Sequence, residues 1–337
     1  VPDGVPADGP TVPDPAAGES DAAPSPKAAV FRGYLERLQA SADGGERPVI
    51  LGELLAMSPD GFTHPDDAGW ALQLVLLLLD DGAPLEPIWA WAETLAARFP
   101  QTSFVVSLQA AVADVLRAID GDTFGGRIPD DRVDALFRRS LELEPEGPNT
   151  YVRAGTYFLG QGELGDAERC LARGFRLDRL NGHAAVSLAN VYRQTDRARD
   201  ALAVLDLCLR EGSDDPSVAW EAALAAYHAD QFESLLTYLD RHDALLPDQP
   251  WAGYYRAMGL LELGRPAEAV DALGVEADRN PDSEFGVEVL RACAAAALGQ
   301  PDAFRAHAEA VLAVRWSTID TFTRRRGTGG VCGSCSF

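Results

Sequence analysis

The feature that most constrains this chain is an internal repeat of 34 residues in its second half. Turn-forming positions recur at that interval, in the series Gly162, Asp196, Asp230, Gly264 and Leu298, with the last turn glycine one place late at Gly299. Two further series keep the same phase, namely Ala167, Ala201, Leu235, Ala269 and Ala303, and then Leu171, Leu205, Leu239, Leu273 and His307. A period of this length is typical of stacked supersecondary units that bury their apolar faces only against their neighbours.

Each unit is predicted to contain two helices, A and B, joined by a short turn. The stretch Gly264–Ser283 shows a helix B that begins after a glycine and stops at Asn280-Pro281, because proline cannot continue a helix. Helix A carries a small residue where another helix must approach closely, and these residues are Gly155, Ala189, Ala223 and Ala257.

This combination resembles the tetratricopeptide repeat (TPR) family. The resemblance covers about half of the chain, from roughly Pro148 to Val314. It implies an all-α fold, a right-handed α-solenoid of stacked helix-turn-helix repeats. The fifth copy departs from the family pattern, with Arg291 at the small position and Leu298 at the turn position. Its helix A is therefore expected either to be shifted or to cap the stack.

Helical periodicity also runs upstream of the repeats, and almost no stretch alternates with the period of a strand. The predicted helices fall within residues 28–42, 45–59, 64–82, 86–100, 103–119 and 129–145. The third and fourth are expected to pair, as are the fifth and sixth. The longest apolar run, Ala71–Leu79, is too short to cross a bilayer and is predicted to be a buried helix.

Four segments are expected along the chain. Residues 1–27 belong to a Pro- and Asp-rich stretch that we expect to be disordered, because it buries too little surface to offset its ordering entropy. Residues 28–147 are predicted to form divergent helical repeats, residues 148–316 five TPR-like repeats, and residues 317–337 a flexible Arg-, Gly- and Cys-containing tail. The chain begins with Val, so we expect an N-terminus that has been truncated or processed, in a cytoplasmic protein.

Charge narrows the classes of partner. The formal net charge of -23 argues against a nucleic-acid partner and against an anionic membrane surface, since both need clustered Lys and Arg. We therefore expect a protein or peptide partner and no membrane insertion within this chain.

The five cysteines form two groups. Cys170, Cys208 and Cys293 fall within predicted helices and are expected to be buried free thiols that pack as small apolar residues. Cys332 and Cys335 have a C-x-x-C spacing that lets both sulfurs reach one metal ion or form one disulfide. The stretch Val331–Cys335 weakly resembles the core of methanobactin precursors, which implies enzymatic modification or copper binding. An unmodified tail with no cofactor, or the edge of a further domain, is the alternative.

Catalytic motifs are not found in the sequence. The five histidines, His64, His183, His228, His242 and His307, are isolated from one another, and no nucleophile elbow, phosphate loop or dinucleotide fingerprint is present. We expect the chain not to be an enzyme.

The TPR resemblance implies a groove lined by helices A, with positions 2, 5, 9 and 12 of each repeat facing it. In this register the groove residues are His183, Asn190, Arg193, Trp220, Leu224, Tyr227, Trp251, Tyr254, Met258 and Phe285. The series passes from a polar end with an arginine to an aromatic end suited to anchoring a peptide. The alternative is that the rings only pack between adjacent helices. The dicarboxylate clamp of some family members needs lysine, which these positions lack.

Three functions remain open from the sequence. The leading hypothesis is a non-enzymatic scaffold that binds a peptide in the groove. The second is a carrier whose Cys332 and Cys335 tail is modified or binds metal, with the repeats docking the maturation enzyme. The third is the regulatory portion of a larger protein.

Overall fold

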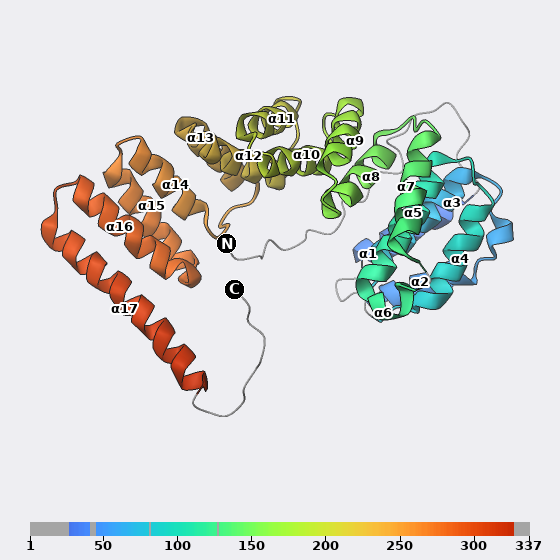
Figure 1. Cartoon of the computed structure of the whole chain (residues 1–337), viewed down its shortest axis with the longest axis horizontal. Coiled ribbons are helices and arrows are strands. Elements are labelled where there is room, and N and C mark those ends of the chain that lie inside the picture. The colour runs from blue at the N-terminus through green and yellow to red at the C-terminus, as the bar shows by residue number, and fades with distance from the viewer. Residues whose placement is uncertain (1–26, 41–44, 81, 127, 327–337) are drawn as a thin grey trace. The chain divides into compact units, whose positions relative to one another are not determined.

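The computed structural model describes residues 27–40, 45–80, 82–126 and 128–326, and all regular secondary structure in these residues is helical (Figure 1). The chain divides into two compact units, Val1–Asp178 and Arg179–Phe337. Each unit is described below by itself. Within the described residues, no helix is both long enough and apolar enough to cross a membrane.

The first unit is built around α5 (Ser103–Ile119), which contacts α3, α4, α7 and α8. Its other elements are α1 (Ala28–Ala40), α2 (Glu46–Ala56), η1 (Pro59–Gly61), α3 (Pro65–Leu78), α4 (Leu85–Ala97), α6 (Gly121–Phe124), α7 (Asp130–Glu142), α8 (Pro148–Gly160) and α9 (Leu164–Leu177). The predicted buried helix is confirmed in α3, where Leu72 and Val75 are fully buried. The predicted pairing of α3 with α4 is less close than the packing of α3 on α5, whereas α5 and α7 pair as predicted.

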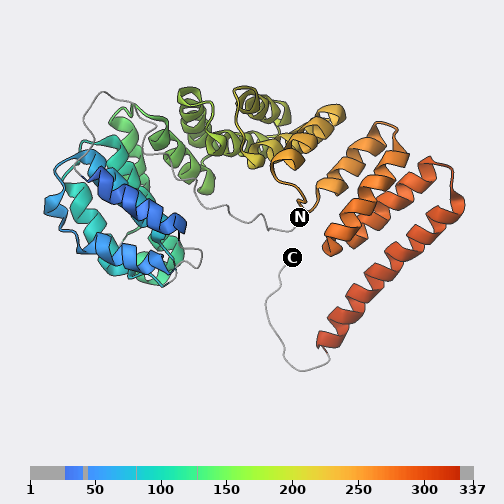
Figure 2. The same ribbon diagram turned by 180° about the vertical axis from the view of Figure 1, so that it is seen from behind.

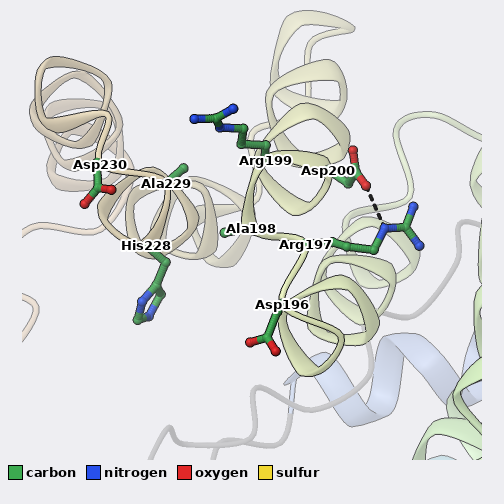
Figure 3. Close-up of a pocket in the computed structure, with 8 residues that line it drawn as sticks. All are labelled: Asp196, Arg197, Ala198, Arg199, Asp200, His228, Ala229 and Asp230. Atoms are coloured by element: carbon green, nitrogen blue, oxygen red, sulfur yellow. Dashed lines mark hydrogen bonds and ion pairs between the residues drawn. The ribbon is translucent and has the colours of Figure 1, made fainter.

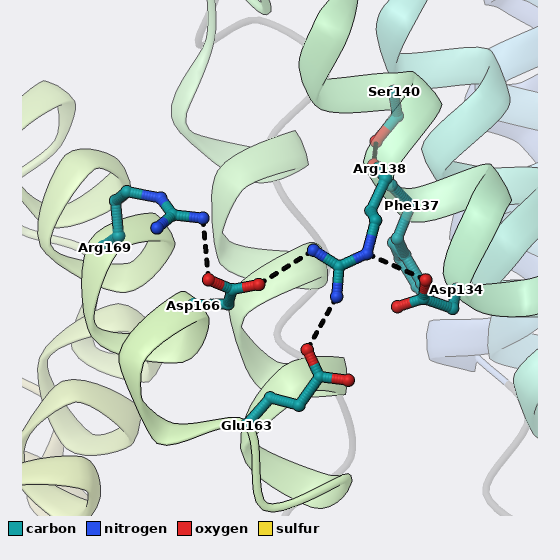
Figure 4. A network of polar contacts seen from close by, with 7 residues as sticks. All are labelled: Asp134, Phe137, Arg138, Ser140, Glu163, Asp166 and Arg169. Atoms are coloured by element: carbon teal, nitrogen blue, oxygen red, sulfur yellow. Dashed lines mark hydrogen bonds and ion pairs between the residues drawn. The ribbon is translucent and has the colours of Figure 1, made fainter.

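One arginine connects the upstream helices of this unit to its first repeat. Arg138 on α7 donates to Asp134 on its own helix at 2.8 Å, to Asp166 on α9 at 2.8 Å and to Glu163 just before α9 at 2.7 Å (Figure 4). Its guanidinium also lies 4.8 Å from the ring centroid of Phe158 on α8. A planar guanidinium has enough donors to hold several carboxylates at once, so this side chain fastens three helices together.

The second unit continues the helix pairs of the repeat. Its elements are α10 (Gly182–Gln194), α11 (Ala198–Arg210), α12 (Pro216–His228), α13 (Phe232–Leu245), α14 (Ala252–Glu262), α15 (Pro266–Arg279), η2 (Pro281–Ser283), α16 (Glu284–Ala297) and α17 (Pro301–Arg326). The helices contact one another in consecutive pairs, α10 with α11, α12 with α13, α14 with α15 and α16 with α17. Together with α8 and α9, these pairs confirm the predicted all-α repeat fold.

The turn between helices A and B has the same geometry in all five copies. The second residue after the end of helix A has a positive φ, which is 76° at Gly162, 56° at Asp196, 57° at Asp230, 69° at Gly264 and 69° at Gly299. In every copy the following amide donates to the carbonyl five positions earlier, at 2.8 to 2.9 Å. This is the Schellman C-cap, which requires a residue tolerant of the left-handed region. It explains why glycine and aspartate recur at this position.

The small residues of helix A lie where the two helices of a repeat touch. A Cβ added to Gly155 on α8 would lie 2.6 Å from Cγ of Leu171 on α9, which is too close for any real contact. Ala223 and Ala257 are fully buried at the corresponding places. The steric role predicted from the repeat is therefore present in the packing.

The fifth copy excludes one of the two alternatives expected for it. Its helix A, α16, begins at Glu284, which keeps the 34-residue phase of Pro148, Gly182 and Pro216, so the helix is not shifted. Arg291 is accommodated because its long side chain reaches away from the tight position, donating to Glu288 at 2.8 Å and to the carbonyl of Leu273 at 3.4 Å.

Two expectations at this end are corrected. Cys170 and Cys208 are buried as predicted, but Cys293 is exposed, because it lies on a face of α16 that its neighbours do not cover. The helix α17 lies beside α16 in both views and runs for 26 residues to Arg326 (Figures 1 and 2). Residues 317–326 are therefore helical, although they were predicted to belong to the flexible tail, because the first glycine of the tail comes only at Gly327. The four-segment division of the chain otherwise stays a prediction.

Candidate peptide-binding surface

The aromatic residues predicted for the groove are joined to one another through a residue that was not predicted, Tyr255. Its ring centroid lies 5.8 Å from that of Trp220, 5.9 Å from that of Tyr227 and 5.8 Å from that of Tyr254. Trp251 extends the chain of rings, at 5.6 Å from Tyr254. These contacts are edge to face, the arrangement that aromatic quadrupoles favour. We call these five residues the aromatic surface.

The aromatic surface comes from two consecutive helices A. Trp220 and Tyr227 lie on α12, Tyr254 and Tyr255 lie on α14, and Trp251 precedes α14. All five side chains are partly exposed. Their rings fix one another, so little side-chain freedom remains to be lost when a ligand binds.

A polar group adjoins the rings. Glu221 on α12 lies with Oε2 3.5 Å from Nη1 of Arg193 on α10, and Arg193 also approaches Oδ1 of Asn190 at 3.4 Å. Burial raises the pKa of the Glu221 carboxyl above its ordinary value, and the Arg193 guanidinium partly opposes that change. Burial also raises the pKa of Tyr255, as do, in decreasing order, Tyr254, Tyr227 and Glu221. The Glu221 carboxylate therefore lies close enough to Tyr255 to raise the pKa of its hydroxyl.

The predicted residues are thus only partly brought together. Trp220, Tyr227, Trp251 and Tyr254 join the aromatic surface, and Asn190 and Arg193 join the polar group around Glu221. Phe285 is 47% exposed on α16, and the ring contacts of the described residues do not extend to it. His183 is exposed, and Leu224 and Met258 are partly exposed. Whether these residues line one groove stays a prediction.

Sequence reasoning missed Glu221 and Tyr255, which occupy the same repeat position 34 residues apart. The register drawn from the family resemblance used the positions 2, 5, 9 and 12. The next position, 6, faces the preceding helix A, as the contacts of Arg193 with Glu221 and of Tyr227 with Tyr255 show. Reading one further position of the repeat would have found both residues.

Trp251 does not lie on a helix, although it was assigned to the start of helix A. It has a φ of 74°, and α14 begins one residue later. Its amide donates to Oε1 of Glu276 at 2.8 Å, and the amide of Gly253 donates to Oε2 at 3.1 Å. Glu276 is 1% exposed, so a buried carboxylate from α15 caps α14 in place of a local side chain.

A partly buried polar layer underlies Trp220. The ring of His242 on α13 is 2% exposed and lies 5.3 Å from the ring of Trp220. Its Nδ1 is 3.6 Å from Asp243, which in turn pairs with Arg256 on α14 at 2.9 Å. Burial raises the pKa of Asp243, but His242 and Arg256 outweigh it, and the net shift is downward. The layer joins α12, α13 and α14 behind the rings.

A separate polar pocket of about 340 Å³ lies between the turns of two adjacent repeats (Figure 3). Its lining residues are Asp196, Arg197, Ala198, Arg199, Asp200, His228, Ala229 and Asp230. Arg197 pairs with Asp200 at 2.7 Å, and Asp196 and Asp230 are the positive-φ residues of the two turns. Because the turn geometry already explains these aspartates, we assign the pocket no ligand.

In the part of the chain that the structure describes, no three His, Cys, Asp or Glu side chains are grouped so that they could hold a metal ion. Cys332 and Cys335 lie outside the described residues, so the prediction for the tail is unchanged.

Comparison with known proteins supports the fold alone. No known family model matches the sequence, and no curated protein matches it. Among solved structures, the chain is similar to the C-terminal part of a TPR repeat-containing protein from Cytophaga hutchinsonii, with a TM-score of 0.53 and 11% identity over 76% of this chain and 93% of that one. YrrB, a TPR protein with an unusual peptide-binding site, matches with a TM-score of 0.49 and 16% identity over 56% of this chain and 97% of that one. MamA matches with a TM-score of 0.47 and 15% identity over 56% of this chain and 98% of that one.

The fold is therefore that of TPR-repeat proteins, as the helix pairs and the five Schellman turns already indicated.

Proposed function

We propose that this chain is a non-enzymatic scaffold that binds a peptide segment of another protein on the aromatic surface. The observation that carries the proposal is the partly exposed chain of rings contributed by two consecutive helices A. Tryptophan and tyrosine are enriched among the few residues that supply most of the binding energy at protein interfaces, since they bury a large apolar area and keep a polar atom for hydrogen bonding.

The hydroxyl groups support the same proposal. Within the described residues, no hydrogen bond engages the hydroxyls of Tyr227, Tyr254 or Tyr255. By contrast, Tyr238 on α13 donates to Asp206 at 2.7 Å, so its hydroxyl serves the fold. Three phenols without an internal partner are free to bind the backbone of an incoming peptide.

Selection from a random dodecapeptide library displayed on phage, with the full chain as bait, tests the proposal. The affinity of the selected peptides is then measured by fluorescence anisotropy for the wild type and for the double variant Trp220→Ala and Tyr254→Ala. We expect the double variant to raise Kd by at least about tenfold, since each removed anchor is worth more than about 1 kcal/mol.

The matched control is Tyr192→Ala, which removes a partly exposed tyrosine of α10 outside the aromatic surface. Circular dichroism establishes that each variant keeps its helical content. A library that yields no binder, or peptides that bind the double variant as tightly as the wild type, would reject the proposal.

A further inference from the structure

The chemistry beside the rings indicates which kind of peptide the aromatic surface selects. Glu221 has only 22% of its side chain exposed, and its contact with Arg193, at 3.5 Å, is at the outer limit of a hydrogen bond. Tyr255, on the next helix A, is influenced electrostatically by this carboxylate. A poorly hydrated carboxylate with one long contact therefore lies on the helix that carries Trp220 and Tyr227, within electrostatic range of Tyr255.

The basic side chains nearby are already occupied. Arg193 contacts both Asn190 and Glu221. Arg256 of α14 forms ion pairs with Asp240 at 2.6 Å and with Asp243 at 2.9 Å. The surface thus offers a carboxylate and electron-rich rings, while its own guanidinium groups are paired. It is suited to a cation and poorly suited to an acidic peptide.

We propose that the aromatic surface selects a basic peptide, whose Arg or Lys side chain lies against Tyr255 and its neighbouring rings and ends at Glu221. This inference rests on the proposed function, because it names the partner class of the same surface. A cation is attracted to the face of an aromatic ring, and the attraction grows when both groups lose water. Pairing with Glu221 adds a charge-assisted hydrogen bond in a site that is already partly desolvated.

Arg193 does not block this arrangement. Its side chain is 41% exposed, so the guanidinium can turn into water when a second cation reaches Glu221. The exchange replaces a long contact with a shorter one and leaves the Arg193 guanidinium hydrated by solvent. The net charge of -23 also attracts a basic partner over long range at low ionic strength.

The test uses the tightest dodecapeptide from the selection and two synthetic analogues, in which one basic residue is replaced by citrulline or by Glu. Selected peptides are expected to be enriched in Arg or Lys. For the wild type, citrulline is expected to raise Kd about tenfold and Glu still further. For Glu221→Gln, an isosteric change, the parent peptide and the citrulline analogue are expected to bind within about twofold of each other. Glu262→Gln, an exposed acid on α14, is the matched control and should preserve the discrimination.

The binding measurements distinguish a failure of this inference from a failure of the proposed function. Peptides that need Trp220 and Tyr254 but show no enrichment in basic residues would overturn the inference and leave the function standing. The inference also fails, with the function intact, if citrulline costs as much with Glu221→Gln as with the wild type, since Glu221 would then not be the partner. Peptides that need none of the rings would overturn both.

Discussion

In the second unit, consecutive helices A meet at the same two repeat positions, but the residues there differ in chemistry. Between α10 and α12, which we call the polar step, Arg193 forms an ion pair with Glu221 at 3.5 Å. Between α12 and α14, which we call the aromatic step, the rings of Tyr227 and Tyr255 lie 5.9 Å apart. The repeat decides where consecutive helices A meet, and the side chains at that place decide which chemical groups the surface presents.

The two steps also begin their second helix differently. On α12 the cap is local, because Asp215 accepts from the amide of Ser217 at 2.9 Å. On α14 the acceptor is the buried Glu276 of α15, which holds the amides of Trp251 and Gly253. The aromatic step therefore depends on its own helix B for the position of Trp251, whereas the polar step does not depend on α13 in this way.

The largest effect on stability is expected for Glu276→Ala, which removes the carboxylate that holds the start of α14. Two amides at the start of α14 and the side-chain amide of Asn280 would lose their acceptor in a buried place. Hydrogen bonds to a carboxylate contribute roughly 1.5–3 kcal/mol each, but the variant also no longer has the cost of burying a carboxylate. We therefore expect a net loss of about 2–4 kcal/mol in the free energy of unfolding. Urea denaturation followed by circular dichroism measures it, and hydrogen exchange should localise the loss to α14.

The control for this variant is Glu268→Ala on the same helix. Glu268 is exposed and pairs with Arg265 at 2.6 Å, and such surface pairs contribute little to stability because water screens them. If the two variants lose the same stability, Glu276 does not hold the start of α14.

A double-mutant cycle on the aromatic step is expected to give the next largest effect. The variants are Tyr227→Leu, Tyr255→Leu and both together, and the coupling should be about 0.5–1.5 kcal/mol, in the range of aromatic pairs. It should change little with salt. A cycle of Tyr238 on α13 with Tyr255, between which the described residues show no ring contact, should give a coupling near zero. Equal coupling in the two cycles would mean that the rings do not act as a unit.

A double-mutant cycle on the polar step should give a smaller coupling energy. With Arg193→Gln and Glu221→Gln, the expected coupling is about 0.2–1 kcal/mol, since Arg193 is well exposed. It should fall as the salt concentration rises, because added ions screen exposed charges. A coupling that is larger than that of the tyrosines, or independent of salt, would remove the distinction between the two steps.

These contrasts show what the sequence could and could not predict. The positions of the turns and of the tight helix contacts followed from the period, because glycine, aspartate and alanine meet local requirements that recur in every copy. The meeting of Tyr227 with Tyr255 depends on how one helix A lies on the next, which the period does not specify. The capping of Trp251 by Glu276 joins residues 25 positions apart and breaks the pattern in a single copy. A feature that occurs in only one copy cannot be predicted from the pattern that all copies share.

The smallest effect concerns the titration of the tyrosines themselves. Burial raises the pKa of Tyr254 and Tyr255 above the ordinary value of 10.0, and their phenolic neighbours raise it further. Because the folded state holds these protons more tightly than the unfolded state, the resulting stability is fully present below pH 10 and is lost as the pH rises through the folded pKa. Phenolate absorbance should show a late-titrating component that shrinks in Tyr255→Phe, and this variant should lose less stability above pH 10 than the wild type. If Tyr255→Phe instead removes a component that titrates in the ordinary range, Tyr255 is fully hydrated, and the aromatic step is not the more desolvated of the two.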